Sequence, residues 1–111
     1  MKKINTVKKH AEFDALVHGG KRLRSPHFTF FFEKSELGYT RIGISVGKKN
    51  GGAVTRVRIK RQVRAMIASR GDLTLSMNLI IAVRPDFIQC EFHELEKELN
   101  ESFDRIKELL N

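Results

Sequence analysis

The sequence predicts an α+β fold, a small two-layer α/β sandwich with three helices packed on a mixed sheet of about four strands. Alternating apolar residues at 27–33 and 41–46, and a continuous apolar run at 77–83, predict strands. Apolar residues three and four positions apart at 53–69 and 92–110 predict amphipathic helices. Because a helix separates the second and third strands, the sequence indicates a parallel crossover within the sheet.

Length and composition fit one intracellular domain. The chain has 111 residues, of which 41% are hydrophobic and 31% charged, and a core of this size needs no disulfide or metal to hold it. We therefore expect a single domain over residues 1–111, with a basic arm at residues 1–9. No apolar run approaches the roughly 18 residues that cross a bilayer, and the N-terminus has no signal-peptide segment. A cytoplasmic protein without a membrane partner is expected.

Cysteine and histidine usage argues against a disulfide and against a metal site. Cys90 is the single cysteine and is expected to be a structural or surface residue. The four histidines show no metal-ligand spacing. The sequence therefore predicts no metal site on the protein, and it gives no indication of a protein partner.

The first predicted helix is short. In residues 10–20, Phe13 and Val17 belong to an apolar pattern at helical spacing, and a pair of glycines ends this pattern. Because the helix is only about two turns long, it needs tertiary packing to form. Residues 21–24 read as a basic connector to the first strand.

The strand at 27–33 is dense in aromatic residues. Its alternation places Phe31 among polar neighbours on one face and three phenylalanines on the other face, which we expect to be the core. These three are Phe28, Phe30 and Phe32. The strand at 41–46 alternates in the same way, and the two runs predict an antiparallel pair.

The helix at 53–69 is basic except for one apolar stripe. A helical wheel gathers the stripe from side chains that we expect to pack on the sheet, namely Ile59, Val63, Met66 and Ile67. Val57 departs from this division, because it falls among cations on the charged side. The last helix, at 92–110, combines a continuous apolar stripe with an acidic outer face.

Charge is distributed unevenly along the chain. The net charge is +8, but residues 1–85 carry 18 basic and 5 acidic side chains, whereas residues 86–111 carry 3 and 8. No Asp or Glu occurs between residues 41 and 70, where a solvated helix would mix Glu with Lys. A polyanion is therefore the expected partner. Nucleic acid is favoured over a membrane, because the basic helix lacks an exposed Trp, Phe or Leu face.

We predict a phosphate-binding surface on the glycine-rich loop at 47–52 and on the helix that follows it. Backbone N–H groups at the start of the helix would point toward a phosphate, and Lys and Arg side chains would surround it. The predicted nucleic-acid-binding residues are Arg41, Lys48, Lys49, Arg56, Arg58, Lys60, Arg61 and Arg64.

A second candidate surface is apolar. Phe13 and Val17 on the first helix and Phe31 on the aromatic strand would line a cleft beside the basic helix. Unpaired bases would stack there, at roughly 1–3 kcal/mol each. A core position is an equal alternative for Phe13, whereas the cleft is favoured for Phe31, which lies opposite the aromatic core face.

The sequence offers no catalytic constellation. Acidic residues outside the last helix are scattered over separate elements, the loop at 47–52 lacks the order of a Walker motif, and no nucleophile triad is recognisable. No catalytic residue is therefore predicted, and a metal-dependent nuclease is disfavoured. A non-enzymatic RNA-binding protein of ribosomal or RNA-chaperone type stays open on these grounds.

The run RIGISVGKKNGGAVTRVRIKRQVR at 41–64 resembles the signature of the bacterial ribonuclease P protein subunit. In that signature, G-x-S-V-(S/G)-K-K leads through G-x-A-V into R-N-R-x-K-R-x-x-R. The segments 8–20, 27–32 and 77–85 are similar to the first helix, the aromatic strand and the last strand of the family. The resemblance therefore covers nearly the whole chain.

The resemblance implies a ribosomal protein S5 domain 2-like fold with a left-handed crossover, against the right-handed default. It implies that the chain binds ribonuclease P RNA, and that this RNA, which holds most of the Mg²⁺ cofactor, cleaves the 5′ leader from precursor tRNA as an endoribonuclease. The protein would not be the catalyst, and its cleft of Phe13, Val17 and Phe31 would hold the single-stranded leader. Val57 replaces the Asn of the motif, and Val17 stands where an aromatic residue is common.

Overall fold

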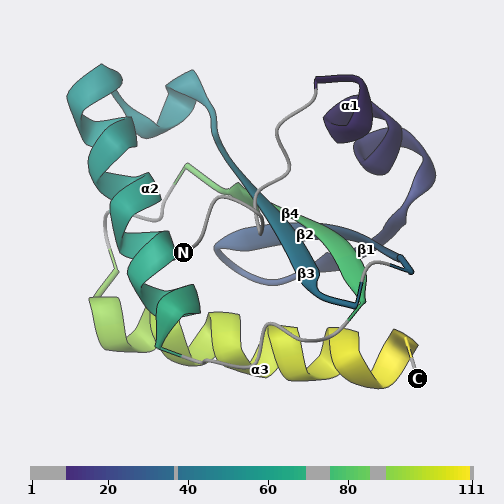
Figure 1. The fold of residues 1–111 in the computed structure, drawn as a ribbon. Helices are drawn as coiled ribbons and strands as arrows, with labels where there is room; N and C mark the ends of the chain where they lie inside the picture. Colours follow the sequence, from purple (N-terminus) through teal and green to yellow (C-terminus); the bar gives the residue numbers. More distant parts are fainter. Residues whose placement is uncertain (1–9, 37, 70–75, 86–89, 111) are drawn as a thin grey trace.

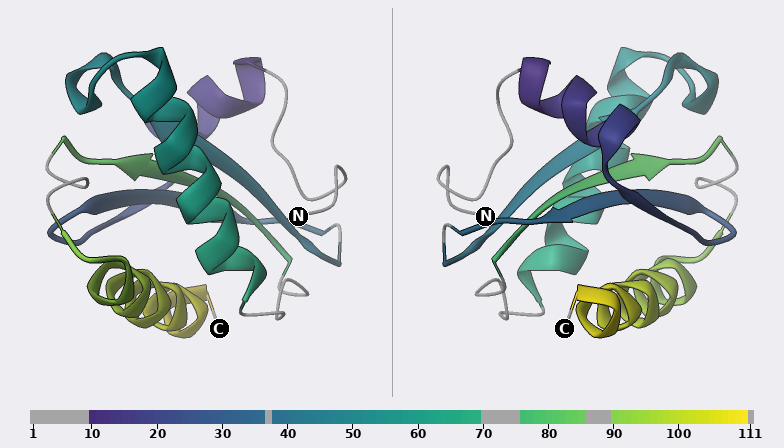
Figure 2. Two further views of the ribbon diagram at one scale, coloured as in Figure 1. Left: turned by 90° about the vertical axis from the view of Figure 1, so that its left-hand side faces the viewer. Right: turned by 90° about the vertical axis from the view of Figure 1, so that its right-hand side faces the viewer.

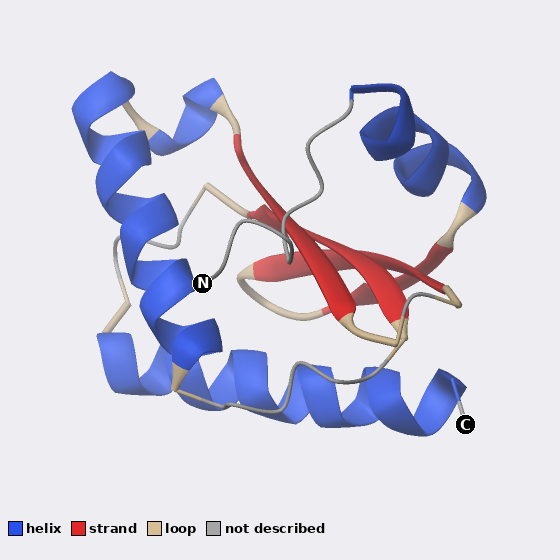
Figure 3. Cartoon of the chain, viewed as in Figure 1, coloured by secondary structure: helices blue, strands red, loops and turns tan. Residues whose placement is uncertain are grey.

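The computed structural model describes residues 10–36, 38–69, 76–85 and 90–110 (Figure 1). The predicted basic arm at residues 1–9 lies outside the described residues. In chain order the elements are α1 (His10–Gly19), β1 (Lys21–Arg24), β2 (Phe28–Lys34), β3 (Thr40–Val46), the 3₁₀ turn η2 (Lys48–Asn50), α2 (Ala53–Ala68), β4 (Met77–Val83) and α3 (Phe92–Leu110). Helices and strands in these proportions confirm the predicted α+β class (Figure 3). Within these ranges, no helix has both the length and the apolar character that a membrane span requires.

The strands of the described residues form one mixed sheet in the order β1, β2, β4, β3. β4 pairs antiparallel with β2 and parallel with β3, so the connection through α2 is the predicted parallel crossover. The predicted antiparallel pairing of β2 with β3 is wrong, because β4 lies between them. The physical reason is that β4 is buried on both faces, through Leu79 and Ile81 on one and Ile80 on the other. A strand that is apolar on both faces is covered only in the interior of a sheet.

β1 has no clear signal in the sequence, where residues 21–24 read as a connector. These residues pair antiparallel with β2, and Arg22 lies opposite Phe31. Three of the four side chains are exposed and basic, so β1 is an edge strand whose charges discourage further strand pairing. Four residues of this composition are too short and too polar to give an alternating apolar pattern.

The main core lies between one face of the sheet and the helices α2 and α3 (Figure 2). Phe28, Phe30 and Phe32 are buried there, as the alternation predicts. The apolar stripe of α2 is also buried, together with the side chains that α3 contributes, which are Leu95, Leu99, Phe103, Ile106 and Leu110. Because burying one such side chain stabilises the fold by about 1.5–3 kcal/mol, this layer fixes α2 on the sheet.

Helix α1 covers part of the opposite face of the sheet. Figure 2 shows α1 and α3 on opposite sides of the strands. Leu16 of α1 is buried, as is Ile80 of β4, which points away from the main core. Gly20 allows α1 to turn closely into β1, because an added Cβ would lie 2.7 Å from the carbonyl oxygen of Leu16.

Glu98 joins α3 to the start of β2. Its carboxylate accepts a hydrogen bond from the backbone N–H of His27 (2.8 Å) and from Ser25 Oγ, and it lies 2.6 Å from His27 Nδ1. The other ring nitrogen of His27 lies 3.0 Å from Sγ of Cys90, which is half-buried against the core. This arrangement of thiol, imidazole and carboxylate has no sequence signal, because 71 positions separate His27 from Glu98.

Replacing Glu98 with Ala should lower the free energy of unfolding by about 1–3 kcal/mol, because the half-buried N–H of His27 loses its acceptor. Urea unfolding at constant pH measures this change. Glu108→Ala is the matched control, since Glu108 is exposed on the same helix. A loss no larger than that of the control would show that this contact does not hold α3 against the sheet.

Candidate nucleic-acid interface

The basic loop is anchored to the end of β4. Asn50, the last residue of η2, is only 3% exposed. Its side-chain amide donates to the carbonyl oxygens of Val83 (3.3 Å) and Gly47 (3.2 Å). Lys48 and Lys49 of the same turn are exposed. The buried amide thus holds the turn so that both lysines face solvent. No pattern in the sequence predicts this role of Asn50.

Gly51 turns the chain from η2 into α2. Its φ of 125° and ψ of −167° belong to a backbone region that is essentially limited to glycine. A Cβ at this position would also meet the side chain of Thr55 at 3.2 Å. The N–H of Gly51 donates to the carbonyl oxygen of Lys48 at 3.1 Å. This tight turn brings the two lysines of η2 to the N-terminal end of α2.

Helix α2 begins without a side-chain cap. Gly52 is the N-cap residue, and its carbonyl oxygen accepts a helical hydrogen bond from the N–H of Arg56 at 3.0 Å. The N–H groups of a first turn have no partner within the helix and favour an anion, and this turn contains no acidic residue. The start of α2 therefore suits a phosphate group, in line with the prediction from the loop sequence.

The cations of α2 cover its outer face. Arg58, Arg61 and Arg64 are exposed, whereas Arg56 and Lys60 are half-buried. The Nε of Arg56 is buried and has no hydrogen-bond partner within the described ranges. Like charges four residues apart, such as Arg56 and Lys60, destabilise a helix. A polyanion bound to this face would relieve the repulsion.

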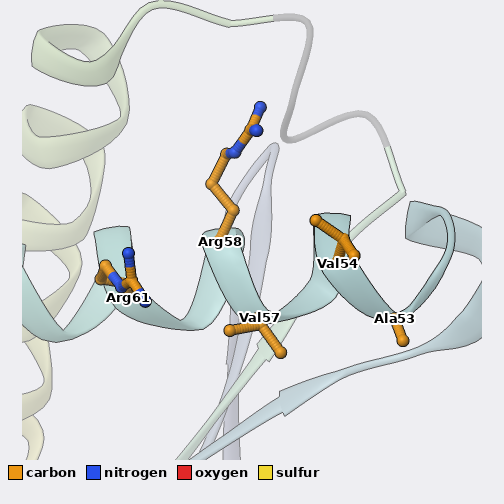
Figure 4. Close-up of a pocket in the computed structure, with 5 residues that line it drawn as sticks. All are labelled: Ala53, Val54, Val57, Arg58 and Arg61. Carbon is orange, nitrogen blue, oxygen red and sulfur yellow. The ribbon is translucent and has the colours of Figure 1, made fainter.

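The outer face of α2 also holds a shallow pocket of about 370 Å³ near its N-terminal end. The pocket is lined by Ala53, Val54, Val57, Arg58 and Arg61 (Figure 4). Val57, which falls among cations on the helical wheel, is exposed in the structure. The helical wheel therefore separates the buried and exposed faces of α2 correctly, and Val57 belongs to the exposed outer face.

Arg41 lies apart from this surface. It belongs to β3, where Ile42 and Val46 face the core beneath α2, so the alternation of the strand turns Arg41 to the opposite face. Arg41 also stands near the start of β3, whereas Lys48 follows its end. The structure thus places seven of the eight predicted nucleic-acid-binding residues on η2 and α2. Arg41 lies on the second sheet face, which is the face away from the main core and partly covered by α1.

The second sheet face carries Phe31. This side chain is half-buried, and the guanidinium carbon of Arg22 lies 5.5 Å from the centre of its ring. Val17 is half-buried on α1, the helix that covers part of this face. Phe13 belongs to α1, but its side chain lies outside the described residues. The face combines an aromatic ring with the cations Arg22 and Arg41, and Arg22 escaped prediction because β1 was not recognised.

Metal-ligating side chains do not gather in the described residues. No group of three or more His, Cys, Asp or Glu that could hold a metal ion is present there. The carboxylates of α3 are spread along the helix, and Glu98 is engaged with His27 and Ser25. The Mg²⁺ implied by the family resemblance has no ligand cluster in this part of the chain.

Sequence comparison decides the family. The chain matches the family model described as Ribonuclease P over residues 1–107. A ribonuclease P protein component from Mesoplasma florum is 39% identical over 102 residues, which cover 90% of this chain and 93% of the relative. Another from Mycoplasmopsis pulmonis is 33% identical over 108 residues, or 96% of both chains. The chain belongs to the ribonuclease P protein family.

Solved structures of ribonuclease P proteins share the fold. The protein from Staphylococcus aureus has a TM-score of 0.84 at 26% identity, with 96% of this chain and 98% of that chain covered. The protein from Thermotoga maritima has a TM-score of 0.81 at 25% identity, with 90% and 96% covered. These matches confirm the resemblance found at 41–64, and membership of the ribonuclease P family implies an RNA partner.

Gly51→Ala should lower the free energy of unfolding by about 1–3 kcal/mol, because the alanine would be held in a backbone region reserved for glycine. Gly52→Ala is the control, since Gly52 has a φ of −73° and free space around an added Cβ. Urea unfolding of both variants measures the difference. Equal effects of the two substitutions would show that the turn at Gly51 is not constrained.

Proposed function

We propose that this chain is the protein subunit of a ribonuclease P ribonucleoprotein. In this role it binds ribonuclease P RNA through η2 and α2, and it assists the endonucleolytic removal of the 5′ leader from precursor tRNA. The observation that carries the proposal is the acid-free basic surface, in which seven Lys and Arg side chains lie on η2 and α2 with a buried apolar stripe behind them.

The contribution of the protein in this role is electrostatic. A folded RNA brings phosphates close together, and bound Lys and Arg side chains neutralise them in place of counterions. Guanidinium groups grip phosphate oxygens in pairs of hydrogen bonds, and Arg58, Arg61 and Arg64 expose such groups on α2. Hydrolysis belongs to the RNA and its Mg²⁺ ions, and no residue of this chain has a catalytic role.

The second sheet face is the proposed site for the single-stranded leader. Phe31 offers an aromatic ring, and the guanidinium of Arg22 already lies over that ring. A leader base would stack on this ring or on the planar guanidinium that covers it. Arg41 supplies positive charge to the same face. Because α2 packs against the opposite face, the catalytic RNA and the leader would contact separate sides of the sheet.

The test is cleavage of a precursor tRNA by the ribonuclease P RNA of Mesoplasma florum, with and without this protein, at low and at saturating Mg²⁺. We expect the protein to raise the cleavage rate at low Mg²⁺ and to have little effect at saturating Mg²⁺, since both supply charge neutralisation. RNA binding without stimulation would instead indicate a non-enzymatic RNA-binding protein. Cleavage by the protein alone would contradict the assignment of hydrolysis to the RNA.

Phe31→Ala should weaken binding of precursor tRNA to the reconstituted ribonucleoprotein by about fivefold or more, because one stacked base contributes roughly 1–3 kcal/mol. Mature tRNA has no leader, so its affinity should not change. Competition binding with both RNAs measures the difference, and Leu109→Ala, at an exposed apolar residue of α3, is the control. Equal losses for the two RNAs would place Phe31 outside the leader site.

A further inference from the structure

Two valines on the outer face of α2 are exposed without serving the core. Among the described residues, the exposed large hydrophobic side chains are Val54 at 76%, Val57 at 54% and Leu109 at 50%. Val54 and Val57 are three positions apart, so they are neighbours on one side of the helix. The buried stripe of α2 lies on a different side and includes neither residue. An exposed β-branched residue gives a helix no advantage over Lys or Glu, so these valines call for another explanation.

The pocket around these valines has the chemistry of a nucleotide site. Its apolar part is formed by Ala53, Val54 and Val57, and its cationic part by Arg58 and Arg61 (Figure 4). Its volume of about 370 Å³ lies within the range of pockets that hold small molecules in proteins. A nucleobase has apolar faces and its backbone has an anionic phosphate. The two halves of the pocket match these two parts of a nucleotide.

We propose that this pocket binds one unpaired nucleotide of the RNA partner. The base lies against Val54 and Val57, and a neighbouring phosphate is held by Arg58 and Arg61. This inference rests on the proposed function, in which α2 faces ribonuclease P RNA. The nucleotide must be unpaired, because an A-form duplex presents phosphates and 2′-hydroxyls to a protein while its bases stay stacked.

Charge selects RNA over a second copy of this chain as the occupant. There is no Asp or Glu from residue 41 to 69, so two α2 helices brought together at this pocket would repel each other. RNA supplies the opposite charge at regular spacing along its backbone. The same argument separates the roles within the pocket, since the arginines provide attraction to any RNA and the valines respond only to an accessible base.

The test replaces the valines by threonine, singly and together. Threonine keeps the branched shape and a similar helix propensity, and it adds a hydroxyl group to the apolar surface. The probes are a single-stranded oligoadenylate and an abasic ribose-phosphate oligomer of the same length. We expect Val54→Thr with Val57→Thr to bind oligoadenylate about tenfold more weakly, or about 1.4 kcal/mol, and to bind the abasic oligomer as the unmodified protein does.

Two controls separate the valine contact from the phosphate contacts. Lys60→Ala should weaken binding of both oligomers and lower the slope of log affinity against log salt by roughly one, whereas the threonine variant should leave that slope unchanged. Leu109→Gln removes an exposed apolar side chain from α3 and should change neither affinity. Circular dichroism verifies that each variant keeps the helical content of the unmodified protein.

Unchanged oligoadenylate affinity in the double variant would overturn the proposal, and so would equal losses on the two oligomers. Sedimentation that reveals a dimer abolished by the same substitutions would assign the pocket to a second copy instead.

Cleavage of precursor tRNA at low Mg²⁺, measured beside oligoadenylate binding, shows whether the pocket proposal or the proposed subunit role has failed. If the unmodified protein stimulates cleavage while the double variant binds oligoadenylate normally, only the pocket is rejected. If stimulation is absent but the double variant loses oligoadenylate binding, the nucleotide pocket stands and the subunit role is rejected.

Discussion

The rest of the structure depends on how α2 is held against the sheet. The outer face of this helix carries cations, the helix itself contains no Asp or Glu, and Arg56, Lys60 and Arg64 follow one another at intervals of about one turn. Each like-charged pair of this kind destabilises a helix by about 0.2–0.5 kcal/mol. Each buried side chain of the apolar stripe stabilises the fold by about 1.5–3 kcal/mol. Burial is therefore the larger effect, and it allows α2 to present a charge density that an isolated helix of this length would not tolerate.

The central position of β4 connects this core to the phosphate-binding loop. Because β4 is apolar on both faces, it lies between β2 and β3, and the carbonyl oxygen at its last residue accepts the amide of Asn50. At the same end of the sheet, the carbonyl oxygen of His27 accepts the N–H of Arg84 at 2.9 Å, while the N–H of His27 donates to Glu98. One end of a single buried strand thus positions both the loop that carries Lys48 and Lys49 and the helix α3.

Local periodicity was sufficient to predict the longer segments and their faces, including the aromatic core face of β2 and the stripe of α2, but it did not reveal the four-residue strand β1. It was not sufficient for strand order, because the alternation at 27–33 and 41–46 is the same whether the two strands are neighbours or are separated by β4. Order depends on contacts between distant segments, which no window of sequence contains. The sequence could have predicted that Arg41 is separated from α2, since Ile42 beside it is a core residue and neighbouring residues in a strand face opposite sides. The sequence could not have predicted the burial of Asn50, because this burial depends on Val83, 33 positions away.

Charge and topology together restrict where RNA can approach the protein. Helix α3 exposes Glu94, Glu101, Asp104 and Glu108, and it meets α2 at the C-terminal end of that helix, where Ser69 Oγ lies 3.5 Å from Glu96 Oε2 (Figure 1). Repulsion between Glu96 and RNA extends over about 10 Å at 0.1 M salt, so it opposes contact with the last turn of α2. Val54 and Val57 lie near the first turn, at the end of the helix away from α3. The pocket around these valines therefore lies at the end of α2 where the carboxylates of α3 repel RNA least. The uncapped N–H groups of α2 and the two lysines of η2 are at the same end of the helix.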